Sequence, residues 1–235
     1  MEKQEAKQLI ADSKNIYLIT SEEPEAITST LALFYTLKDL GKNVNLLTDN
    51  LPENLKFLSP SLDFISYPKN FVLSVPNSVA KISQIYYEKN DEALKVHLTL
   101  ESGNIKKDNI SFYFQEAKPD LIITLGVEDY QKELSEKLNS FGFLLDSPVV
   151  NIDNKQDNKK FGKINLVEEK SLAEIIIELV SNQNKNAANC LLAGLVIYTD
   201  NFKKNLKAEI FQATSDLMKN GANLQEIVNN IKPVQ

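Results

Sequence analysis

The chain has 235 residues, 43% of them hydrophobic, so it can bury the core of one large domain. It contains no run of about eighteen apolar residues, which excludes a membrane-spanning helix of ordinary length. Its net charge is −6 and it has no arginine, whereas nucleic-acid binders present a basic surface and favour the guanidinium fork for phosphates; polynucleotide binding is therefore not expected.

The first part of the chain predicts a β-α-β unit. Residues 15–20 form a short run of strand-forming residues. Residues 29–40 repeat apolar residues at helical spacing, and Gly41 stands where a C-terminal cap is expected. Residues 43–47 predict the next strand. A unit of this kind places its two strands parallel in one sheet through a right-handed crossover.

Residues 71–114 differ in character and predict an inserted β-rich subregion. Polar and apolar residues alternate along residues 94–100, which is typical of a strand with one solvated face. The other predicted strands are 71–75 and 84–88, and residues 90–92 supply a tight connection. We expect an antiparallel hairpin or small sheet that either covers a sheet edge or forms a subunit contact.

The second part of the chain continues the α/β pattern. Residues 120–125 and 149–152 are continuous apolar strands, as expected where both faces of a sheet are covered. Helices are predicted at 128–139, 171–180, 187–197, 208–218 and 224–231. The predicted fold class is therefore α/β, with a parallel Rossmann-like sheet flanked by helices, an inserted antiparallel β-hairpin or small sheet, and a helical C-terminal part. Residues 1–235 are expected to form one such domain.

The single cysteine and the N-terminal residues bear on location. Cys190 cannot form an internal disulfide and suits a reducing cytoplasm, although a disulfide-free secreted protein stays open. Its neighbours Leu191 and Leu192 indicate a buried small side chain. The start of the chain is charged and helix-prone, unlike a secretory leader. We predict a cytoplasmic protein.

Four segments carry polar or glycine residues at the ends of predicted elements. They are ITSEEPEAITS at 19–29, PDLIITLG at 119–126, VVNIDNKQDNKKFGKINLV at 149–167 and LLAGLVIYTDNF at 191–202. Their sequences and their order resemble the N-terminal domain of the DHH phosphoesterases, of the oligoribonuclease and pAp-phosphatase type. The resemblance covers about residues 15–231. The family's second domain, a substrate clamp, is expected to be missing, because the chain ends at Gln235.

The resemblance implies a site for two divalent ions, commonly manganese, that clamp the oxygens of a phosphoester. In this chain the matching positions are largely replaced. Ser21 stands at the position of a histidine ligand, and Glu25 lies near the position of the first aspartate. Gly126 replaces an aspartate in the second segment, and Tyr198 replaces one in the fourth.

The signature Asp-His-His triplet of the family reads Asp153-Asn154-Lys155 here, so Asp153 is the one ligand retained in place. Too few anionic or imidazole donors remain for two dications. The resemblance thus implies a vestigial cleft without metal or catalytic residues. Lys155 either pairs with Asp153, replacing part of the charge of the metal, or is an exposed loop lysine.

Three functional hypotheses follow from the sequence. The first is a catalytically inactive DHH-type domain kept as a binding or assembly module, with a protein partner or a homo-oligomer. The second is a small-nucleotide-binding protein whose phosphate contacts come from Ser21, Thr28, Ser29, Asn151, Asn154 and Lys155 at the carboxyl ends of the strands. The third is a residual manganese-dependent phosphoesterase acting on short oligoribonucleotides or pAp. His97, the only histidine, lies on the polar side of a predicted inserted strand and offers no other catalytic route.

Overall fold

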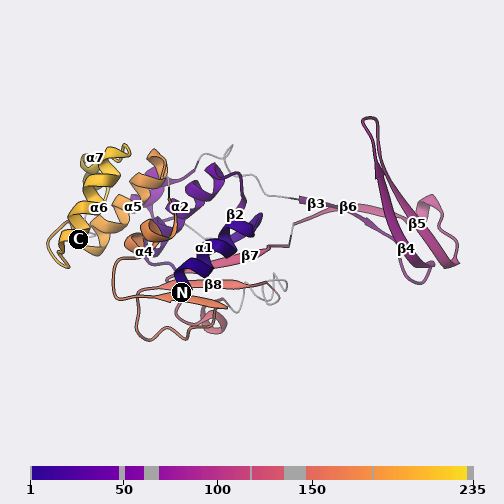
Figure 1. Cartoon of the computed structure of the whole chain (residues 1–235), viewed down its shortest axis with the longest axis horizontal. Helices are drawn as coiled ribbons and strands as arrows, with labels where there is room; N and C mark the ends of the chain where they lie inside the picture. The colour runs from indigo at the N-terminus through magenta and orange to yellow at the C-terminus, as the bar shows by residue number, and fades with distance from the viewer. Residues whose placement is uncertain are drawn as a thin grey trace. The chain divides into compact units, whose positions relative to one another are not determined.

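The structure, a computed structural model, describes residues 2–47, 51–60, 69–116, 118–134, 147–181 and 183–231. It divides into two compact units (Figure 1). Unit 1 comprises Met1–Pro68 and Lys118–Gln235, and unit 2 comprises Lys69–Ala117. Among the described residues, no helix is both long enough and apolar enough to cross a membrane.

Unit 1 is built on a five-stranded parallel sheet in the order β2-β1-β7-β8-β9. The strands are β1 (Asn15–Thr20), β2 (Asn43–Leu47), β7 (Leu121–Leu125), β8 (Val149–Asp153) and β9 (Ile164–Val167). Every residue of β7 is buried, because helices and loops cover both faces of the sheet. The predicted α/β class with a parallel sheet is confirmed. β9 was not predicted, because four residues are too few to show a period.

Helices pack around this sheet, and α2 is the most deeply buried of them. The helices are α1 (Glu2–Asp12), α2 (Pro24–Asp39), α4 (Leu172–Leu179), α5 (Lys185–Tyr198), α6 (Ala208–Lys219) and α7 (Leu224–Asn230), with a 3₁₀ helix η1 (Glu53–Leu58). All residues of α2 from Ala26 to Leu37 are buried, and α2 packs against α5. α2 begins five residues before the predicted start at residue 29, because Pro24 fits the first turn and fixes its φ.

The helix predicted at 128–139 is described only in part. It begins at Tyr130, and the described portion ends at residue 134. The Oδ1 atom of Asp129 accepts hydrogen bonds from the backbone N–H groups of Gln131 and Lys132, at 3.1 and 3.2 Å. Asp129 therefore caps the helix, as aspartate commonly does. Residues 135–139 lie outside the described residues.

Unit 2 contains two antiparallel ribbons (Figure 1). The strands are β3 (Lys69–Ser74), β4 (Ala80–Lys89), β5 (Leu94–Gly103) and β6 (Ser111–Glu116), with a short 3₁₀ helix η3 (Lys107–Asn109). β3 pairs with β6, and β4 pairs with β5. The Oδ1 atom of Asn90 accepts from the backbone N–H groups of Glu92 and Ala93 and closes the β4–β5 turn. The predicted inserted hairpin is confirmed, and the β3–β6 ribbon adds a strand that was not predicted.

Candidate functional site

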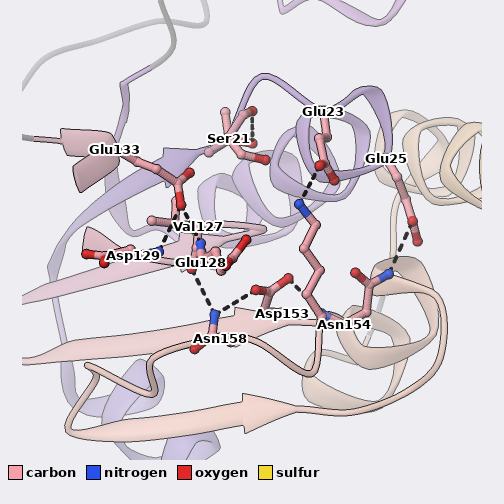
Figure 2. A network of polar contacts seen from close by, with 12 residues as sticks. Ser21, Glu23, Glu25, Val127, Glu128, Asp129, Glu133, Asp153, Asn154 and Asn158 are labelled. Carbon is pink, nitrogen blue, oxygen red and sulfur yellow. Dashed lines mark hydrogen bonds and ion pairs between the residues drawn. The ribbon is translucent and has the colours of Figure 1, made fainter. Parts of the chain in front are cut away.

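Three neighbouring strands of unit 1 end at the same edge of the sheet. The backbone N–H of Ser21, just after β1, donates to the carbonyl of Leu125 in β7 at 3.1 Å. The backbone N–H of Gly126, just after β7, donates to the carbonyl of Ile152 in β8 at 2.9 Å. Asp153 is the last residue of β8. Ligands of open α/β sheets bind at such an edge, so we take it as the candidate site (Figure 2).

Gly126 occupies a position at this edge that has no room for a side chain. Its φ is +66°, a left-handed conformation that glycine adopts without strain. A Cβ atom on Gly126 would lie 2.7 Å from the Cβ of Ala26 and 2.7 Å from the Oγ of Ser21. That Oγ is itself buried and makes no hydrogen bond within the described residues. A carboxylate at position 126 does not fit this backbone.

Asp153 is completely buried, at 0% exposure, and the chain itself satisfies its carboxylate. The Oδ1 atom accepts from the backbone N–H of Asn154 at 2.8 Å. The Oδ2 atom accepts from the side-chain amide of Asn158 at 2.6 Å (Figure 2). A buried carboxylate persists only when such partners replace the water it has lost. Both of its oxygens are therefore used inside the fold.

Asn158 connects Asp153 to the interior of the sheet. Its amide also donates to the carbonyl of Val127 at 2.9 Å, and its Oδ1 accepts from the amide of Asn151 at 2.6 Å. The Oδ1 of Asn151 in turn accepts from the hydroxyl of Thr124 at 3.1 Å. We call this set the asparagine network: Thr124, Asn151, Asp153, Asn154 and Asn158. Sequence reasoning did not single out Asn158, although its signal was the recurrence of asparagine at 151, 154 and 158.

Glu25 lies in the first turn of α2, yet its carboxylate stabilises a different helix. Its Oε1 accepts from the backbone N–H of Leu172 at 2.7 Å and from the hydroxyl of Ser171 at 2.9 Å. These donors form the N-terminus of α4, which attracts negative charge. The Oε2 atom accepts from the amide of Asn154 at 3.3 Å (Figure 2). Glu25 thus joins α2, α4 and the segment after β8.

Burial raises the pKa of Glu25 above its ordinary value of 4.5, and the hydrogen bonds from Leu172, Ser171 and Asn154 offset this only in part. A raised pKa means that the folded state favours the protonated form. As the pH rises, the unfolded chain therefore ionises first, and stability falls until the pH has passed the folded-state pKa. We expect wild type to lose more stability between about pH 4 and pH 7 than the Glu25→Gln variant.

Urea unfolding at the two pH values measures this difference, because contributions from other groups cancel between wild type and variant. Glu22→Gln is the matched control, because Glu22 lies three residues earlier, is exposed, and loses the same carboxylate in this variant. Equal pH dependence of wild type and Glu25→Gln would contradict the role assigned to burial.

Lys155 does not pair with Asp153, so that hypothesis is wrong. Its ammonium forms an ion pair and hydrogen bond with Glu23, the residue before α2. The pKa of Lys155 is raised chiefly by the hydrogen bond to Glu23, and the charge of Asp153 contributes less. Asp153 relies on amide donors instead, because Asn158 and the backbone of Asn154 already occupy its oxygens.

Tyr198, the last residue of α5, lies close enough to Glu25 for the two to interact electrostatically. Burial raises the pKa of the Tyr198 phenol, and the negative charges of Glu25 and Glu174 raise it further. The turn that follows is left-handed at Asp200, Asn201 and Phe202. The sequence-predicted residues therefore fall into contacts at one edge: Ser21 with Gly126, Glu25 with Asn154, and Lys155 with Glu23.

The donor set at this edge does not fit a pair of divalent ions. Gly126 leaves no space for a carboxylate, and the oxygens of Asp153 and Glu25 already accept hydrogen bonds from amides, a hydroxyl and the backbone. Across the residues that the structure describes, no group of three or more His, Cys, Asp or Glu side chains could hold a metal ion. Two dications close together need several such ligands at once.

A cavity of about 260 Å³ borders the site. It is lined by Asn154, Lys155, Gln156, Lys160, Val167, Glu168 and Glu169. The two lysines are balanced by two glutamates, so the lining shows no excess of positive charge for a phosphate. Of the residues expected to contact a phosphate, Thr28, Ser29 and Asn151 are fully buried, and the Asn151 amide is engaged in the asparagine network.

No protein-family model matches the chain, and no curated protein matches it. Among solved structures, an exopolyphosphatase-related protein from Bacteroides fragilis matches with a TM-score of 0.68 and 16% identity, covering 100% of this chain and 61% of that one. The exonuclease RecJ bound to manganese matches with a TM-score of 0.42 and 12% identity, covering 94% of this chain and 47% of that one. The chain thus has the fold of the Bacteroides protein and spans 61% of its length.

Proposed function

We propose that this chain is a DHH phosphoesterase-like domain that has exchanged its metal centre for an internal hydrogen-bond network and serves as a binding or assembly module. The carrying observation is Asp153, which is 0% exposed and has both oxygens bonded to amide donors of the chain. In the family that the sequence resembles, the matching aspartate is a metal ligand. Here the side-chain amide of Asn158 donates a hydrogen bond to that carboxylate.

Two further contacts support the same proposal. The Cβ position of Gly126 is filled by Ser21 and Ala26, so the space that a second carboxylate needs is taken by the scaffold. Glu25 caps α4 through the Leu172 N–H, which gives this carboxylate a structural role. Both contacts give a structural role to positions that match or lie near metal ligands in the resembled family, which supports a site no longer maintained for catalysis.

The proposal predicts no tight manganese site and no manganese-dependent hydrolysis. Calorimetric titration with MnCl₂ should show no binding of two ions per chain at micromolar affinity. Release of phosphate from pAp, and cleavage of short oligoribonucleotides, should stay at the buffer rate with and without manganese. An active phosphoesterase assayed in parallel verifies the conditions.

Binding of two ions per chain at micromolar affinity would contradict the proposal. So would hydrolysis that needs manganese and disappears in an Asp153→Asn variant. That variant tests whether the turnover belongs to this site, because hydrolysis that survives it comes from a contaminating enzyme.

The small-nucleotide alternative draws on the cavity beside Asn154, Lys155 and Lys160. Its mixed charge and the burial of Thr28, Ser29 and Asn151 make it the weaker candidate. A thermal-shift screen with pAp, AMP and cyclic dinucleotides separates the two, because a ligand that binds only the folded state raises the melting temperature. We further propose a cytoplasmic location, since Cys190 is a free and buried thiol.

A further inference from the structure

One face of the β4–β5 ribbon is apolar except at the end beside the turn, where Lys89 lies opposite Leu94. Side chains alternate between the two faces of a strand, and residues opposite each other share a face. The register places Ile85 opposite Leu98 and Tyr87 opposite Val96. An irregularity near residues 81–84 keeps Ile82 opposite Leu100. We call this surface the apolar face: Ile82, Ile85, Tyr87, Leu94, Val96, Leu98 and Leu100.

The opposite face of the ribbon carries mostly polar side chains. Tyr86 stacks on His97 with ring centroids 4.5 Å apart, and Glu88 lies opposite Lys95. The Nε2 atom of His97 is 3.7 Å from a carboxylate oxygen of Glu88. The two faces therefore differ as they do in antiparallel sheets that have one face in solvent and the other packed against an apolar surface.

Side chains of the apolar face are largely exposed within the described residues. Tyr87 is 73% exposed, Ile85 is 68% exposed and Leu94 is 63% exposed. A two-stranded ribbon is marginally stable alone, and it needs a second layer on its hydrophobic face. In the part of the chain that the structure describes, β4 and β5 form a sheet of two strands (Figure 1). Contiguous exposed apolar surface of this kind marks an interaction site.

We propose that the apolar face packs against the same face of a second copy of this chain, so that the protein is a homodimer. This inference is independent of the metal site, and its test uses a different measurement. Charge favours a copy as the occupant: residues 69–117 contain six lysines and six acidic residues, whereas the rest of the chain carries the whole net charge of −6. The insertion is thus the neutral part on which two acidic chains can meet with least repulsion.

Shape and area agree with a dimer. An apolar face without a directional charge pattern is self-complementary, as a two-fold interface requires. Two such ribbons can stack at about 10 Å, the spacing of packed sheets. With about 100 Å² buried at each of five exposed apolar side chains, a pair of copies would bury roughly 1,000 Å², which reaches the lower range of specific interfaces.

The test compares two tyrosines that are neighbours in sequence and lie on opposite faces. Sedimentation equilibrium of the full wild-type chain at micromolar concentration should give twice the monomer mass of 26.5 kDa. Tyr87→Lys places a charge in the centre of the apolar face and should raise the dimer dissociation constant about 30-fold or more. Tyr86→Lys adds the same charge on the polar face and should leave the dimer intact.

Both variants reduce the net negative charge equally, so general repulsion cannot explain a difference between them. Far-UV circular dichroism should be unchanged in both, because Tyr86 and Tyr87 are exposed at 51% and 73%. A monomeric wild type would overturn the proposal. A dimer that survives Tyr87→Lys, or that Tyr86→Lys disrupts equally, would overturn the assignment to this face.

Discussion

Replacing Asn158 with alanine should destabilise the protein by about 3 kcal/mol or more, because it leaves a buried carboxylate without its side-chain donor. Asn158 is 6% exposed and donates to Asp153 at 2.6 Å and to the carbonyl of Val127 at 2.9 Å. The variant also removes the 2.6 Å acceptor of the Asn151 amide, which keeps only a longer contact to the Oδ1 of Asn165 at 3.4 Å. Urea unfolding at neutral pH, followed by circular dichroism, measures the change in the free energy of unfolding.

Asn165→Ala is the matched control. Asn165, in β9, accepts from the backbone N–H of Gly162 at 3.0 Å and donates to its carbonyl at 2.8 Å, so its main partners are uncharged. Its loss should cost about 1–2 kcal/mol, the value of ordinary hydrogen bonds. If Asn158→Ala costs no more than Asn165→Ala, Asp153 does not depend on the Asn158 amide.

Substituting Gly126 with alanine should destabilise the protein by about 3 kcal/mol. A left-handed φ of +66° costs a residue with a Cβ atom about 1–2 kcal/mol. The contacts of 2.7 Å to Ala26 and Ser21 add an overpacking cost of about 1–3 kcal/mol. The same experiment tests the metal-site argument, because an aspartate at this position would meet the same two neighbours.

Gly41→Ala separates the two contributions. Gly41 follows α2 with a φ of +72°, and a Cβ atom there would have nothing within 4 Å. Its substitution should therefore cost only about 1 kcal/mol, from the backbone conformation alone. If Gly126→Ala and Gly41→Ala lower the free energy of unfolding equally, the edge at Gly126 relaxes and can accommodate a side chain.

Much of the fold could be predicted from local sequence because the strands of unit 1 are buried on both faces. β7 and β8 are mostly apolar runs that read LIITL and VVNID, and the confirmed hairpin of unit 2 alternates polar and apolar residues. β6 escaped prediction because its pairing depends on β3, which lies far earlier in the chain, and β9 because it has only four residues. The register of β9 against β8 is set by tertiary contacts, which a local sequence pattern does not show.

At the candidate site, the sequence indicated which residues matter, but it did not indicate which residues they contact in the fold. Lys155 precedes two more lysines, and nothing in that segment points to Glu23, which lies 132 residues away. The role of Glu25 as a cap of α4 likewise depends on how α2 and α4 pack. Asparagine is ambiguous in sequence, since the same residue type serves turns, caps and buried networks.

The pairing of Lys69 with Glu116 places the first strand and the last strand of unit 2 side by side at their outer ends. A segment whose two ends lie side by side can be inserted or deleted in one genetic event with little change to the chain on either side. The two units can therefore have separate evolutionary histories.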